Sequence, residues 1–85
     1  MKKFEYTITN EIGLHARPAS LLFKLVKSLD SKVTLIKGEK SADATSIFAL
    51  MGMAIKKGDN IEITAEGGDE EKSMETLEAF FKENL

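Results

Sequence analysis

The sequence contains no cysteine, and this absence excludes two kinds of site. A chain without thiols forms no disulfide and holds no metal ion through thiolate ligands. Disulfides also mark proteins of oxidising compartments, so a chain without cysteine fits a reducing one. We therefore expect a cytoplasmic protein.

Long apolar runs and an excess of one charge are missing as well. The 85 residues include 12 basic and 14 acidic side chains, which give a formal net charge of −2. This balance offers no electrostatic reason to expect nucleic acid as the main partner. No apolar run has the length of a signal peptide or a membrane span, so we expect no membrane insertion. The length predicts a single domain over residues 1–85 with one modest core, and we expect a monomer.

What the sequence does contain is a regular succession of strand and helix patterns. Alternating apolar and polar residues predict strands at about residues 2–9, 32–37, 40–44 and 61–66. Helical spacing predicts helices over 16–29, 47–55 and about 70–85. Gly38-Glu39 is expected at a hairpin tip, Asp69 as the cap of the last helix, and the basic residues and glycine of 56–58 at the end of the second.

This order of elements, β-α-β-β-α-β-α, predicts the fold class. Each predicted strand has one apolar face, as in an antiparallel sheet that is packed on one side. We therefore expect an α+β open-faced sandwich, with a four-stranded antiparallel sheet covered on one side by three helices.

The only histidine, the only arginine and the only proline lie together in His15-Ala16-Arg17-Pro18, at the start of the first predicted helix. The first amides of a helix have no partner inside it and, with the helix dipole, favour an anion. Pro18 has no amide to lose and is tolerated in the first turn. The backbone amides of Ala16 and Arg17 are therefore expected to face a ligand, and the Arg17 guanidinium adds donors suited to phosphate.

His15 at this position can act as a nucleophile. The ordinary pKa of imidazole is about 6.5, so a neutral form exists at physiological pH and can become a covalent intermediate. Taken singly, the three residues have simpler explanations: His15 as a cap or a solvated residue, Arg17 as a surface residue, Pro18 as a helix-start signal. No carboxylate pair, metal cluster or nucleotide loop accompanies them, so no cofactor or metal is expected. The site is typical of a relay whose donor and acceptor are other proteins.

The segment Gly13-Leu14-His15-Ala16-Arg17-Pro18-Ala19 resembles the active-site motif of the HPr family, the histidine phosphocarriers of the bacterial phosphoenolpyruvate:sugar phosphotransferase system. The resemblance extends over essentially the whole chain. It implies that His15 accepts a phosphoryl group on Nδ1 from Enzyme I and donates it to IIA domains of sugar permeases, with assistance from Arg17. It implies a covalent carrier in a transferase relay rather than a free-standing enzyme.

A second candidate site is Ser46, which precedes the short apolar helix and is a favourable N-cap. Ala49 stands where a capping box would need Glu or Gln. The resemblance implies a further role, because in Gram-positive relatives the matching serine is phosphorylated by HPr kinase/phosphorylase and then recognised by a catabolite regulator. Those relatives often have a lysine where this chain has Thr45. Capping alone is the alternative.

The 47–55 helix is apolar nearly all round, which one sheet does not require. Leu50 and Ile55 are predicted to face the core. We expect the docking residues to form an exposed apolar patch with basic neighbours: Leu21, Lys24, Lys27, Ile47, Phe48 and Met51. Such a patch suits acidic partners, and the resemblance implies that these positions contact Enzyme I and the IIA proteins. The alternative places Phe48 and Met51 in the core.

Three functions remain open. The first is the general phosphocarrier, which the presence of both His15 and Arg17 favours. The second is a regulatory binding module of the same fold, acting through Ser46 phosphorylation or in a nitrogen-related phosphotransferase branch. The third is an unrelated small ligand-binding α+β domain, which would bind a metabolite and transfer no phosphoryl group.

Overall fold

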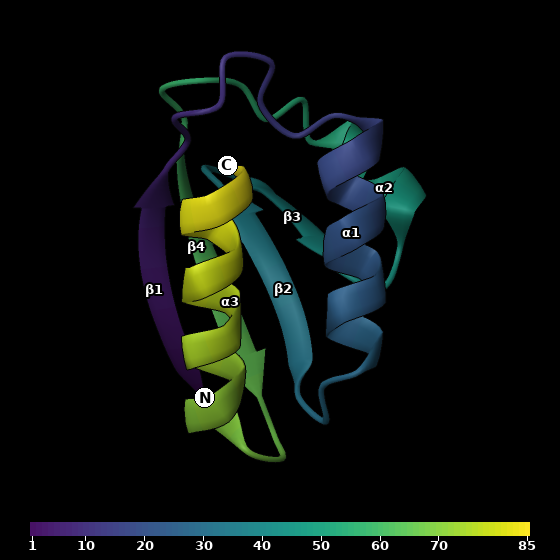
Figure 1. Ribbon diagram of the computed structural model, residues 1–85, viewed down its shortest axis with the longest axis vertical. Helices are drawn as coiled ribbons and strands as arrows, with labels where there is room; N and C mark the ends of the chain where they lie inside the picture. Colours follow the sequence, from purple (N-terminus) through teal and green to yellow (C-terminus); the bar gives the residue numbers. More distant parts are fainter.

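The computed structural model describes all 85 residues and has the predicted order of elements, β-α-β-β-α-β-α (Figure 1). The elements are β1 (Lys2–Thr7), α1 (Ala16–Lys27), β2 (Lys32–Lys37), β3 (Lys40–Asp43), α2 (Ile47–Gly52), β4 (Asn60–Glu66) and α3 (Glu70–Asn84). None of the three helices combines the length and the apolar character needed to span a bilayer.

The four strands form one antiparallel sheet in the order β1-β4-β2-β3. The register places Ile63 of β4 opposite Phe4 on one side and opposite Leu35 on the other. Alternate residues of the two central strands are fully buried on one face, as period two requires. The sheet therefore has one apolar face, and the predicted fold class is confirmed.

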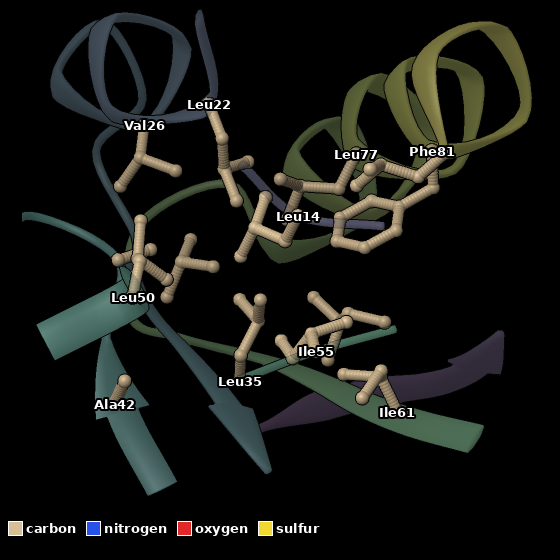
Figure 2. Packing of buried hydrophobic residues seen from close by; sticks show 14 of the residues in the cluster. Leu14, Leu22, Val26, Leu35, Ala42, Leu50, Ile55, Ile61, Leu77 and Phe81 are labelled. Atoms are coloured by element: carbon tan, nitrogen blue, oxygen red, sulfur yellow. The ribbon is translucent and has the colours of Figure 1, made fainter. Parts of the chain in front are cut away.

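Helices α1 and α3 lie side by side across this face, and α2 packs beside α1 (Figure 1). Leu22 of α1 and Phe81 of α3 point from the helices toward Leu35 and Ile61 of the sheet (Figure 2). Leu50 of α2 reaches the same layer and is fully buried. The core is thus one continuous cluster between the sheet and the helices.

Local signals in the sequence fix several element ends. Asp69 caps α3 as predicted, because its Oδ1 accepts a hydrogen bond from the Lys72 amide at 3.1 Å. Gly38 lies at the tip of the β2–β3 hairpin with a positive φ of 58°, between the paired residues Lys37 and Lys40. The first helix ends at Lys27, before the predicted end at residue 29, where the Ser28 hydroxyl donates to the Leu25 carbonyl at 2.6 Å.

The prediction for the second helix is wrong at its C-terminal end. The helix stops at Gly52 rather than at residue 55, because Ala54 adopts a left-handed backbone with φ of 52°. The basic residues at 56 and 57 therefore lie outside its last turn. Lys37 of β2 instead donates from Nζ to the Ala54 carbonyl at 3.0 Å, so the cation at this helix end comes from a distant strand.

Candidate functional site

The loop between β1 and α1 crosses one end of the sheet and carries the predicted site (Figure 1). Its conformation begins at Asn10, whose Oδ1 accepts a hydrogen bond from the Ile12 amide at 2.8 Å. Such an Asx turn is a local interaction of the asparagine side chain with the backbone two residues on. The turn directs the chain toward Gly13 and Leu14, which anchor the loop.

Gly13 is required where it stands. Its φ is 78°, and a Cβ at this position would lie 2.3 Å from the carbonyl oxygen of Ile55. The Leu14 amide donates to that same oxygen at 3.1 Å, and the Leu14 side chain is buried in the core (Figure 2). The residue that follows this anchor is His15.

The segment against which Gly13 packs is itself held in place. Asp59 Oδ2 accepts a hydrogen bond from the Lys56 amide at 2.8 Å and pairs with Lys37 Nζ at 2.9 Å. The Lys56 amide first, and the Lys37 ammonium second, hold the pKa of the Asp59 carboxyl below its ordinary value. The backbone oxygen of Ile55 is therefore a fixed support for the loop.

His15 occupies the N-cap position of α1 in an extended backbone conformation, with φ −109° and ψ −173°. Its main-chain oxygen accepts a hydrogen bond from the Ala19 amide at 3.0 Å. Its half-buried side chain caps nothing and makes no hydrogen bond within the chain. The explanation of His15 as a side-chain cap is therefore wrong, and both ring nitrogens are free of protein partners.

The first amides of α1 are open, as the sequence predicts. The amides of Ala16 and Arg17 donate to no acceptor in the chain, and Pro18 has none. No acidic residue lies in the first turn. No carboxylate of the first turn therefore offsets the partial positive charge of this helix end, which would stabilise an anion bound there.

Arg17 is exposed and takes part in none of the four salt bridges of the molecule. With His15 it borders a cleft of about 310 Å³. The cleft is lined by Asn10, His15, Arg17, Pro18, Leu21, Glu83 and Asn84. The far wall thus comes from the end of α3, which is the last helix of the chain.

A second cleft of about 300 Å³ lies at the opposite end of the molecule, where α3 begins. Its lining includes the carboxylates of Asp30 and Asp69, and Asp69 already occupies the α3 N-terminus. It contains no histidine. Nowhere in the structure do three or more His, Asp or Glu side chains converge in a way that could hold a metal ion.

Ser46 is the N-cap of α2, and its Oγ accepts a hydrogen bond from the Ala49 amide at 3.2 Å. The capping role is therefore confirmed. The turn before it is closed by Thr45, whose hydroxyl and amide donate to Asp43 Oδ1 at 2.6 and 2.9 Å. These two bonds, the hydroxyl first, hold the pKa of the Asp43 carboxyl below its ordinary value.

Most of the predicted docking residues are on the surface. Phe48 is 90% exposed, Leu21 42% and Met51 41%, so the alternative that Phe48 and Met51 belong to the core is wrong. Ile47 differs from the prediction that it belongs to the exposed patch, because it is half-buried and packs against the core.

The two lysines are exposed and the two core residues are buried, as predicted. Lys24 and Lys27 are exposed on α1, and the Lys27 ammonium lies 5.1 Å from the centre of the Phe23 ring. Leu50 and Ile55 are buried, although Ile55 lies beyond the end of α2. The exposed large apolar side chains of α1 and α2 are therefore Leu21, Phe48 and Met51, and we call these three residues the apolar patch.

The sequence reasoning missed the residues that complete the cleft. Glu83 and Asn84 carry no local signal for the site, because their contact with it is long-range. Asn10 does carry one, since an asparagine shortly before a glycine is typical of a turn.

Comparison with known proteins places this geometry among relatives. Residues 2–83 match the family model described as PTS HPr component phosphorylation site. The chain is 43% identical over 77 residues to phosphocarrier protein HPr of Mycoplasma capricolum, covering 91% of this chain and 86% of that protein. It is 41% identical over 75 residues to phosphocarrier protein NPr of Escherichia coli K12, covering 87% and 83%. The solved structure of a Mycoplasma histidine-containing phosphocarrier protein is similar with a TM-score of 0.89 and 40% identity, covering 93% and 90%.

Proposed function

Because this chain belongs to the HPr family of phosphotransferase-system phosphocarriers, we propose that it carries the phosphoryl group on His15. In this proposal Enzyme I supplies the group, with phosphoenolpyruvate as its source, and IIA domains of sugar permeases receive it in the cytoplasm. The observation that carries the proposal is an imidazole without hydrogen bonds at the uncapped N-terminus of α1.

The chemistry requires a nucleophile that is free to react in both directions. The lone pair of a His15 ring nitrogen, Nδ1 in the family, forms a bond to phosphorus while the bond between phosphorus and the donor breaks. The donor keeps the electron pair of the broken bond. In the second step a nucleophile of the acceptor bonds to phosphorus while the bond between phosphorus and the His15 nitrogen breaks, and the nitrogen recovers its electron pair. No side chain must first release the imidazole, because His15 is hydrogen-bonded to none.

The surroundings of His15 suit the charge that arrives with the phosphoryl group. The unpartnered amides of Ala16 and Arg17 supply fixed donors, and the helix dipole adds about 0.3–1 kcal/mol for an anion at this end. The guanidinium of Arg17 forms no salt bridge within the chain, so it supplies a charged donor that is free to turn toward the phosphoryl group. Donors that are in place before the reaction cost no reorganisation during it.

The apolar patch gives a partner a place to dock next to the site. Leu21 both contributes to this patch and lines the His15 cleft. Exposed Lys24 and Lys27 on the same helix favour partners with acidic surfaces. The patch is small, which suits the brief encounters of a carrier that must leave one partner to reach the next.

The decisive experiment measures the intact mass of the protein after incubation with phosphoenolpyruvate and a bacterial Enzyme I. We expect one added phosphoryl group that is labile in acid and absent from His15→Ala. A folded wild-type protein that stays unmodified beside an active Enzyme I would overturn the proposal. A group that persists in acid would place the modification on a hydroxyl and direct attention to Ser46.

A regulatory role is the second candidate, and the position of Ser46 favours it. Ser46 begins the helix that presents Phe48 and Met51, so a charge on its hydroxyl would lie beside the apolar patch. HPr kinase/phosphorylase and a catabolite regulator are the partners in this case. Ser46→Asp keeps a capping side chain and adds a charge. We expect it to weaken docking to Enzyme I, measured by calorimetric titration, and unchanged affinity would remove Ser46 from the interface.

A further inference from the structure

No hydrogen bond fixes the His15 imidazole, so its position depends strongly on the backbone that carries it. The residue is also only half-buried. Phosphoryl transfer within a docked complex is sensitive to misplacement of the reacting atom by as little as about 1 Å. The residues that hold the preceding loop therefore decide where the nucleophile lies.

The loop of residues 10–14 is anchored on two sides. On one side, the backbone of Gly13 and Leu14 packs against the Ile55 carbonyl. On the other side, the loop meets the end of α3 near Asn84 and Leu85 (Figure 1). The connection on this second side passes through Asn10.

Asn10 uses every polar group that it has. Its side-chain Nδ2 donates to the Asn84 carbonyl at 3.1 Å, and its backbone amide donates to the Leu85 main-chain oxygen at 2.8 Å. Its Oδ1 accepts from the amides of Ile12 at 2.8 Å and Gly13 at 3.3 Å. Its carbonyl accepts a further bond from Gly13 at 3.0 Å. One side chain thus shapes the loop and ties it to α3.

We infer that Asn10 is a positioning residue for phosphoryl transfer: it fixes the loop before His15, and hence the nucleophile, against the end of α3. The two residues line the same cleft, together with Asn84. The effect of Asn10 on the rate of phosphoryl transfer rests on the proposed function. The holding of the loop by Asn10 can be tested without any partner.

Loss of the Asn10 side chain should leave the fold in place. Thr9 still donates from its hydroxyl to Leu85 at 3.0 Å, and Leu14 still donates to Ile55. The apolar patch lies on other elements, so docking should be preserved. Loosening of the loop should therefore lower kcat much more than it raises KM.

The experiment compares three variants. Asn10→Ala removes all side-chain bonds. Asn10→Ser keeps a neutral acceptor that can form a weaker turn but cannot reach Asn84. Ser31→Ala is the matched control, because Ser31 is also a polar hub, bonded to Gly67 and Ser73, but lies at the opposite end of the molecule from the site.

For Asn10→Ala we expect kcat with Enzyme I and phosphoenolpyruvate to fall roughly 10- to 100-fold, with KM within about twofold of wild type. Asn10→Ser should lie between wild type and Asn10→Ala. Ser31→Ala should melt at a lower temperature and transfer at the wild-type rate. If Asn10→Ala and Ser31→Ala change transfer equally, or if Asn10→Ala transfers normally, the inference is wrong.

Amide hydrogen exchange tests the loop without Enzyme I. We expect the Ile12 and Gly13 amides to exchange about 10-fold faster in Asn10→Ala and at an intermediate rate in Asn10→Ser. Unchanged exchange overturns the inference. If Asn10→Ala does not fold, Asn10→Ser decides it by the same two measurements.

Phosphoramidate, a small phosphoryl donor that needs no docking, separates the two proposals. It should modify His15 in wild type and in both Asn10 variants at rates within about threefold of one another, because the imidazole itself is unchanged. Wild type that reacts with phosphoramidate but not with Enzyme I would overturn the proposed function alone, and hydrogen exchange would then judge Asn10. A phosphoramidate rate that falls as much as the Enzyme I rate would contradict a role in positioning.

Discussion

The N-termini of α1 and α3 are built in opposite ways. At α3, Asp69 accepts a hydrogen bond from the Lys72 amide, and Glu70 and Glu71 place negative charge in the first turn. At α1, the residue in the capping position is His15, which caps nothing, and the first turn has no acidic residue. The helix that follows the capping rules stabilises itself. The helix that breaks them leaves its donors free for a ligand.

The largest expected effect comes from making α1 resemble α3. In His15→Asp, the new carboxylate should cap α1 and raise the free energy of unfolding by about 0.5–1 kcal/mol, while phosphoryl transfer is abolished. Thermal unfolding and the mass assay measure the two effects. His15→Ala is the control, and it should lose transfer without the gain in stability. A His15→Asp protein less stable than His15→Ala would mean that the α1 N-terminus cannot accept a cap.

Removal of the mobile cation at α1 should have the next largest effect. Arg17→Ala keeps the free amides but loses the charged donor, so we expect transfer to slow roughly 10- to 100-fold. The affinity for Enzyme I, measured by titration, should stay within about threefold of wild type, because Arg17 is outside the apolar patch. An equal loss of affinity and rate would assign Arg17 to docking instead.

At α3 the corresponding change should affect stability alone. Asp69→Ala removes the cap and should lower the free energy of unfolding by about 1 kcal/mol, a fall in melting temperature of roughly 4–8 °C. Transfer at room temperature should be unchanged, since Asp69 lies at the other end of the molecule from His15. Asp69→Ser, which restores a capping oxygen, should recover most of the loss. A slowed transfer in Asp69→Ala would mean that the two ends are coupled.

The smallest expected effect concerns acid. The Gly67 amide, at 2.8 Å from Glu70 Oε2, and then the N-terminal ammonium hold the pKa of Glu70 below its ordinary value. A carboxyl with a lowered pKa in the folded state stabilises the fold above its unfolded pKa, and this contribution is lost as the pH falls through the folded pKa. Glu70→Gln should therefore be less stable near neutral pH, and its stability should fall less below about pH 4.3. Parallel pH–stability curves for the two proteins would show that Glu70 is not involved.

The sequence predicted the features that depend on neighbouring residues. The alternation of apolar and polar residues located the strands, and an aspartate before the last helical pattern indicated the cap of α3. The only histidine and the only arginine marked the N-terminus of α1. The apolar character of α2 on all sides indicated an exposed Phe48, with burial as the alternative. In each case the signal and its structural consequence lie within a few residues of one another.

What the sequence did not predict depends on contacts between distant residues. The second helix ends early because Ala54 adopts a left-handed backbone, and Lys37 of β2 donates to the carbonyls of Met53 and Ala54 just beyond the last helical residue. The cleft wall formed by Glu83 and Asn84 requires the packing of α3 beside the β1–α1 loop. The propensities of single residues do not describe contacts between residues that are distant in the sequence. The family resemblance identified the motif at residues 13–19, but it did not point to Asn10 or to its hydrogen bonds.

The bonds from Thr9 and Asn10 to Asn84 and Leu85 join residues about 75 positions apart. During synthesis, His15 emerges from the ribosome long before α3 exists, so a nascent chain has His15 without the cleft that it lines in the folded protein. Closing so long a loop also costs conformational entropy, and contacts of this kind therefore form late in folding. We therefore expect the cleft to be among the last parts of the molecule to assemble, which makes a nuclear magnetic resonance signal from the His15 ring a natural reporter of completed folding.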